Sequence, residues 1–167
     1  MNSMEPMIAE LQHEAATTRR LLERVPQDRL TWQPHAKSMT LGRLAAHIAN
    51  LPGMLVGALT EDKLDADDLK AQSPSAESVA DILQAFDQKI ERSLELLKTQ
   101  RDESFMLAPW RYTSGEHVIF EMPRLAVIRF VVLNHIIHHR GQLSVYLRLL
   151  DVPLPSVYGP TADEQAA

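Results

Sequence analysis

The sequence contains no cysteine among its 167 residues, which excludes disulfide bonds and metal sites built on thiolates. A metal ion would have to be held by histidine, carboxylate or water. The formal net charge of −5 argues against a protein that binds nucleic acid. The chain also lacks a serine-nucleophile motif and a glycine-rich loop of the kind that binds phosphate.

Long hydrophobic runs are absent as well. No uncharged apolar stretch reaches 18 residues, so we expect no transmembrane helix and no membrane partner. The N-terminus, MNSMEPMIAELQHE, carries acidic residues and has no apolar core, so it does not resemble a signal peptide. These observations predict a cytoplasmic protein. The length and the 45% content of hydrophobic residues predict a single globular domain over residues 1–167.

Apolar residues recur every three or four positions in four long segments, which is the spacing of one helix face. The predicted helices run from Ser3 to Val25, from Ser38 or Thr40 to Leu59, from Ala76 or Glu77 to Arg101, and from Pro123 to about Leu150. Four helices without a convincing sheet predict an all-α four-helix bundle.

Long connections and a tail join or follow these helices. Residues 61–78 are acidic and predict a solvated loop, and residues 102–122 predict an extended segment or a short hairpin. Pro153 and Pro155 prevent further helix, so residues 152–167 are expected to form an extended C-terminal tail.

Histidines occupy positions where a bundle helix normally carries leucine. The predicted inward stripe of the last helix, spaced alternately by three and four, is Leu125, Ile128, Val132, His135, His139, Gln142, Tyr146 and Leu149. The same spacing places His47 on the inward stripe of the second helix. Side chains four residues apart on a helix lie ~5–6 Å apart, so one ion can bridge His135 and His139.

Three inward imidazoles need partners, because a buried polar group without one costs ~1–3 kcal/mol. A shared metal would remove that cost, and His47, His135 and His139 with open positions would form a catalytic divalent metal site. The alternative is that each ring makes a local hydrogen bond in a polar core.

Other polar residues are weaker candidates. His138 is turned ~100° from His139, so it is expected to face a partner or to form a hydrogen bond beside the site rather than to bind the ion. His13 is expected at the surface or at the boundary of the core, and His35 and His117 are expected to be solvated in loops. Gln142 could orient a ligand or be a polar rim residue. The further alternatives are an anion site or a surface salt bridge for Arg140, and a place near the site or an exposed position for Glu10 and Glu14.

Two stretches resemble the DinB-like (YfiT-like) superfamily of metal-dependent four-helix-bundle proteins. The first is LTWQPHAKSMTLGRLAAHIANLPG. The second is NHIIHHRGQLSVYLRLLDVPLPSVYGPTADE, which contains the core motif H-x-x-x-H-R-G-Q. The resemblance implies that His47, His135 and His139 bind nickel or zinc. It also implies a homodimer and an enzyme that transfers a low-molecular-weight thiol to a small-molecule substrate.

Two other functions fit the same residues. One is a metal-dependent hydrolase that uses metal-bound hydroxide, and the other is a non-catalytic dimer that the metal stabilises. The last helix also carries apolar residues away from the stripe, at Phe130, Leu133, Ile137 and Leu147. Because a helix that is apolar all round is buried all round, we expect this helix to take part in the homodimer.

Overall fold

A computed structural model of the chain describes residues 4–99 and 102–164. The chain is mostly helical, with a small three-stranded sheet. The main helices are α1 (Glu5–Leu22), α2 (Leu41–Asn50), α3 (Pro52–Thr60), α5 (Val79–Lys98) and α8 (Asn134–Leu149). Shorter elements are η1 (Gln27–Arg29), α4 (Ala66–Ala71), α6 (Glu103–Leu107), α7 (Arg124–Ala126) and η2 (Val127–Leu133), with strands β1 (Lys63–Asp65), β2 (Pro109–Ser114) and β3 (His117–Pro123). The expected helix limits Ser3 and Arg101 lie outside the described residues.

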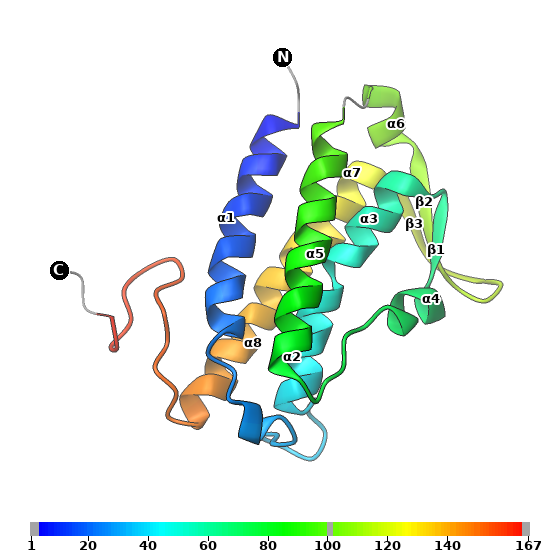
Figure 1. The fold of residues 1–167 in the computed structure, drawn as a ribbon. Coiled ribbons are helices and arrows are strands. Elements are labelled where there is room, and N and C mark those ends of the chain that lie inside the picture. The colour runs from blue at the N-terminus through cyan, green and yellow to red at the C-terminus, as the bar shows by residue number, and fades with distance from the viewer. Residues whose placement is uncertain (1–3, 100–101, 165–167) are drawn as a thin grey trace.

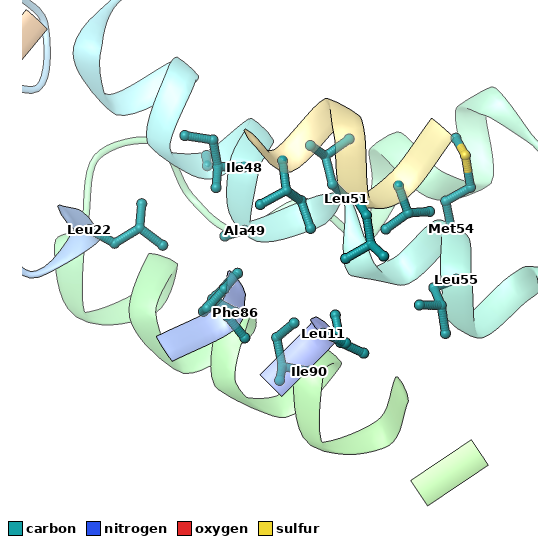
Figure 2. Close-up of a cluster of buried hydrophobic side chains, with 14 of the residues drawn as sticks. Leu11, Leu22, Ile48, Ala49, Leu51, Met54, Leu55, Phe86 and Ile90 are labelled. Atoms are coloured by element: carbon teal, nitrogen blue, oxygen red, sulfur yellow. The ribbon is translucent and has the colours of Figure 1, made fainter. Parts of the chain in front are cut away.

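The long helices lie side by side around an apolar core (Figure 1). Helix α1 packs against α5 and α8, α2 packs against the same two helices, and α3 packs against α5 and η2. Figure 2 shows part of the core between these elements, with Leu11, Leu22, Ile48, Ala49, Leu51, Met54, Leu55, Phe86 and Ile90 labelled. None of the helices that the structure describes is long and apolar enough to cross a membrane.

The sheet corrects the expectation of an all-α chain and that of a solvated loop at residues 61–78, and it confirms the short hairpin that was one alternative for residues 102–122. Strand β2 pairs antiparallel with β3, which makes residues 109–123 a hairpin, and it pairs parallel with β1. Strand β1 and helix α4 fall inside residues 61–78, which we had expected to be a solvated loop. A strand of only three residues gives too short a pattern to be recognised, and it forms because a distant partner supplies its hydrogen bonds. Trp110 of β2 is fully buried and belongs to the same hydrophobic cluster as the core residues of the helices.

The predicted second helix is interrupted at Pro52. Its start was correct, because Thr40 is the N-cap and its hydroxyl accepts a hydrogen bond from the backbone N–H of Arg43. Pro52 has no N–H to donate to the preceding turn, so α2 ends at Asn50 and α3 begins at Pro52. The third helix begins at Val79 with Ser78 as its N-cap, slightly later than expected.

The last helical segment contains a π-helix of seven residues, η2, directly before α8. Its fully buried residues are spaced by five, at Val127 and Val132 and at Ile128 and Leu133, which fits the wider turn of a π-helix. The buried stripe then continues at α-helical spacing through Ile136, Arg140, Leu143 and Leu147. The π-helix therefore moves the core stripe one residue past the one we predicted.

This shift changes the surroundings of the predicted stripe residues. His135 and Tyr146 are half-buried, and Gln142 and Leu149 are exposed. Leu133 and Leu147, which we expected away from the core, are fully buried within the chain, whereas Phe130 is 64% exposed. His139 is buried as predicted, whereas His135 lies at the edge of the core stripe.

Candidate metal centre

The three predicted histidines come from two antiparallel helices. His47 lies on α2, and His135 and His139 lie one turn apart on α8. Near the end of α8, the hydroxyl of Tyr146 donates to the carbonyl of Met39, which precedes α2. This contact shows that the C-terminal end of α8 lies beside the N-terminal end of α2.

The three imidazoles converge. The ring centroid of His47 lies 5.2 Å from the ring centroid of His135 and 4.6 Å from that of His139. The rings of His135 and His139 are also 4.6 Å apart. One ring nitrogen from each residue lies within 4.8 Å of the others, so the group could hold a metal ion.

The donor set and its spacing fit a divalent ion. Metal–nitrogen bonds of 2.0–2.1 Å at a tetrahedral angle place two ligand nitrogens about 3.3 Å apart. The Nε2 atoms of His47 and His135 are 3.5 Å apart, close to that separation. Small side-chain rotations would therefore suffice to bring these nitrogens onto one ion.

Gln142 orients one of the rings. The Nδ1 atom of His139 lies 2.7 Å from the side-chain oxygen of Gln142, and this oxygen can only accept a hydrogen bond. The proton of the neutral ring is therefore on Nδ1, which leaves the lone pair of Nε2 free for a metal. Contacts of this kind fix the tautomer and orientation of histidine ligands in metal proteins.

Burial keeps the rings neutral. It lowers the pKa of His47 from 6.5 to about 4, with smaller contributions from His139, His135 and the cationic Arg43. Burial is also the main reason that the pKa values of His135 and His139 are lowered, although the hydrogen bond to Gln142 partly opposes this effect at His139. Neutral imidazole is the form that binds metals.

The remaining histidines lie outside this group. His138 is exposed, with its ring 4.9 Å from the ring of His139, so it borders the cluster without joining it. His13, His35 and His117 are all exposed, as predicted.

Two acidic residues that we considered near the site are engaged elsewhere. Glu10 forms an ion pair with Arg129. Glu14 is buried, not exposed, and lies 2.6 Å from Arg140, whose side chain is only 2% exposed. Our expectation of a surface salt bridge for Arg140 was therefore wrong in its location. The shift of the buried stripe in α8 places this arginine in the core.

Sequence reasoning missed two residues. Tyr158, in the C-terminal tail, accepts a hydrogen bond from Arg140 and donates one to Glu14, a contact that no local pattern could reveal. Arg43 lies near enough to His47 for its charge to act on the ring. It stands four residues before His47, so the helical spacing that identified the histidines would also have found it.

The comparisons with known proteins cover nearly the whole chain. Residues 1–166 match the model of the family described as the DinB family. A similar protein is the uncharacterized protein YrdA of Bacillus subtilis strain 168. It is 27% identical over 175 residues, with 98% of this chain and 93% of that protein covered.

Two solved structures share the fold. A DinB-like protein of Bacillus cereus ATCC 10987 superposes with a TM-score of 0.73 at 20% identity, over 95% of this chain and 100% of that one. The DinB-like protein YjoA of Bacillus subtilis superposes with a TM-score of 0.70 at 18% identity, over 94% and 100%. At these identities the likeness concerns the fold alone.

Proposed function

The chain belongs to the DinB family, and on that premise we propose that it is a cytoplasmic metal-dependent enzyme built on a four-helix bundle. In this proposal His47, His135 and His139 hold one divalent ion, nickel or zinc. The reaction is the transfer of a low-molecular-weight thiol to a small electrophilic substrate. The observation that carries the proposal is the convergence of three imidazoles from α2 and α8 within 4.8 Å.

The chemistry follows from the charge of such a site. A divalent ion held by three neutral imidazoles keeps its double charge and lowers the pKa of a thiol or water molecule bound to it. The chain's own residues provide the neutral donors, and Gln142 holds the ring of His139 in the tautomer that presents Nε2. His135 and His47 are half-buried, so a small molecule can approach the ring edges from solvent.

Metal binding is the first test. We expect the wild-type chain to bind one equivalent of zinc or nickel, and His135→Ala to lose stoichiometric binding because only two rings remain. His138→Ala is the matched control and should bind normally, since His138 borders the cluster without belonging to it. Isothermal titration with elemental analysis measures both. Equal metal content in wild type and His135→Ala would refute the assignment.

Turnover is the second test. The metal-loaded protein is assayed with several thiols and a reactive electrophile, and separately with ester substrates. Thiol transfer that depends on His135 supports the proposal, whereas hydrolysis without thiol use would assign the same site to a hydrolase. If neither reaction occurs and metal removal only lowers the melting temperature, the metal has a structural role.

We also propose a homodimer formed through the last helical segment. Phe130, Val145 and Leu149 are 64%, 57% and 58% exposed, which is unusual for large apolar side chains. Phe130 also lines an apolar groove with Met7 and Leu125 that a second copy could fill. Light scattering at micromolar concentration is expected to give twice the mass of 18.8 kDa, and a monomer would contradict the proposal.

A further inference from the structure

Each helix of the metal centre carries a polar side chain one turn from a histidine. Arg43 precedes His47 by four residues on α2, and Gln142 follows His139 by three residues on α8. Because the helices are antiparallel, with the hydroxyl of Tyr146 bonded at the start of α2, both side chains lie on the same side of the triad. Both are exposed.

Arg43 differs from most arginines of this chain because its charge has no partner. Ion pairs with acidic side chains engage Arg19, Arg29, Arg92, Arg111, Arg124, Arg129, Arg140 and Arg148. Within residues 4–99 and 102–164, no hydrogen bond or ion pair reaches the guanidinium of Arg43. Its charge nevertheless acts on His47, where it adds to the effect of burial and of the neighbouring histidines in lowering the pKa.

Gln142 also has unused donors. Its oxygen accepts the hydrogen bond from His139, which leaves the two N–H groups of the amide available to a ligand. A divalent ion on three neutral rings would add two positive charges to that of Arg43. The centre would then be cationic in a chain whose formal net charge is −5.

We propose that the substrate of this centre is an anion, a thiol that carries a carboxylate. The sulfur would reach the triad, and the carboxylate would pair with Arg43 about one helical turn away, with Gln142 donating to the same ligand. The Cβ atoms of residues four apart on a helix are ~5–6 Å apart, a separation on the scale of a two- or three-carbon chain. The planar guanidinium matches a carboxylate with two parallel hydrogen bonds.

Arg43 is a better anion site than Arg140, the arginine that the sequence suggested. Arg140 is 2% exposed and is already paired with Glu14, so an incoming carboxylate would have to displace a buried partner. Arg43 is exposed and has no partner to displace. The inference rests on the proposed function for the metal, but the anion site can be tested without it.

The first experiment compares two thiols that differ only in charge. Zinc-loaded full-length protein is titrated calorimetrically with 3-mercaptopropionate and with 3-mercaptopropionamide. We expect wild type to bind the carboxylate roughly five- to tenfold more tightly, the size of a charge-assisted bond weakened by solvent. Arg43→Gln should lose this preference while it keeps its zinc and its affinity for the amide.

Arg92→Gln is the matched control, because it removes the same charge from an exposed site on α5 and should leave the preference unchanged. Arg43→Lys should keep part of the preference, since lysine retains the charge without the planar fork. The proposal fails if Arg43→Gln and wild type show the same preference for the carboxylate.

A second measurement uses the metal-free protein, so that failure of the metal proposal can be recognised separately. Propionate is added while the imidazole signals of the three histidines are followed by NMR. We expect shifts in wild type and in Arg92→Gln but not in Arg43→Gln. If zinc does not bind, the metal proposal falls while these shifts still test the anion site. If propionate shifts wild type and Arg43→Gln alike, the anion site falls regardless of the metal.

Discussion

Two neighbouring residues of α8, His139 and Arg140, face different helices and satisfy their polarity in different ways. Arg140 points to α1, where Glu14 and Tyr158 pair with its guanidinium and close the network within the chain. His139 points to α2, where it meets His47, another ring that offers a lone pair. The face toward α1, with Arg140, balances its charges within the chain, and we call it the closed face. The face toward α2, with His139, gathers lone pairs that only an outside cation can use, and we call it the open face.

The difference shows when buried polar groups indicate a binding site. They do so when they cannot neutralise or hydrogen-bond one another, as with three imidazoles, and not when they can, as with an arginine and a carboxylate. A cation beside a carboxylate neutralises it, and a tyrosine hydroxyl can serve both. Three imidazoles repel one another once protonated, and burial lowers their pKa values so that they stay neutral. The first arrangement stabilises the fold, and the second lowers the cost of binding a metal ion.

The largest expected effect on stability comes from removing the buried ion pair between Arg140 and Glu14 on the closed face. Arg140→Met should destabilise the metal-free protein by about 3–5 kcal/mol, because it leaves the carboxylate of Glu14 buried without a cation. Urea unfolding measures the change. The double variant Arg140→Met/Glu14→Leu should recover most of the loss, since it removes both charges. A loss below about 1 kcal/mol in the single variant would show that Glu14 does not depend on Arg140.

On the open face, substitution of Gln142 is expected to have a smaller effect, on the affinity for zinc and not on stability. Gln142→Leu should weaken zinc binding about 10–100-fold, because His139 loses the acceptor that fixes its tautomer. Gln142→Glu keeps an oxygen acceptor and serves as the control, with affinity near or above that of wild type. Competition with a zinc chelator measures both constants. Unchanged affinity in Gln142→Leu would mean that the ring is oriented by packing alone.

In the metal-free protein, the open face should make the free energy of unfolding depend on acid pH through His47. The pKa of His47 is about 4 in the folded chain and 6.5 without the fold, so the unfolded chain takes up the proton first as the pH falls. Stability should therefore be unaffected by this ring above about pH 6.5 and should decrease toward pH 4. Urea unfolding at several pH values measures this loss of stability. It should be smaller in His47→Gln than in wild type, and unchanged in His13→Gln, which alters an exposed site. Parallel pH profiles for wild type and His47→Gln would contradict the burial of this ring.

The sequence predicted the triad although part of the geometry used to predict it was wrong. Periodicity located His135 and His139 on a common face, and four-residue spacing survives any rotation of the helix. The face itself was displaced, because residues 127–133 form a π-helix whose stripe repeats every five residues. Apolar residues fill both the predicted and the observed stripe in this segment, so the pattern could not distinguish them.

Contacts between distant segments were beyond sequence reasoning. Strand β1 exists because Lys63, Leu64 and Asp65 pair with residues 111–113 of β2. The Arg140 network needs Tyr158, which comes from the tail. In both cases the energy that selects the structure comes from a partner far along the chain, and each segment read alone resembles a polar loop.

The smallest expected effect concerns Tyr158, which links the tail to the closed face although the residue is 66% exposed. Its hydroxyl accepts from Arg140 at 2.7 Å and donates to Glu14 at 2.9 Å. Tyr158→Phe removes the hydroxyl but leaves the ion pair of Arg140 and Glu14 in place, so the expected loss is about 0.5–1.5 kcal/mol in urea unfolding.

The matched control for Tyr158→Phe is Tyr112→Phe, because no hydrogen bond of the Tyr112 hydroxyl is present among the described residues. A loss for Tyr158→Phe as large as that for Arg140→Met would mean that the tail, and not the ion pair, closes this face. In that case the difference between the two faces of α8 would depend on residues outside both helices. A loss confined to the smaller range would leave the buried ion pair as the main stabilising element.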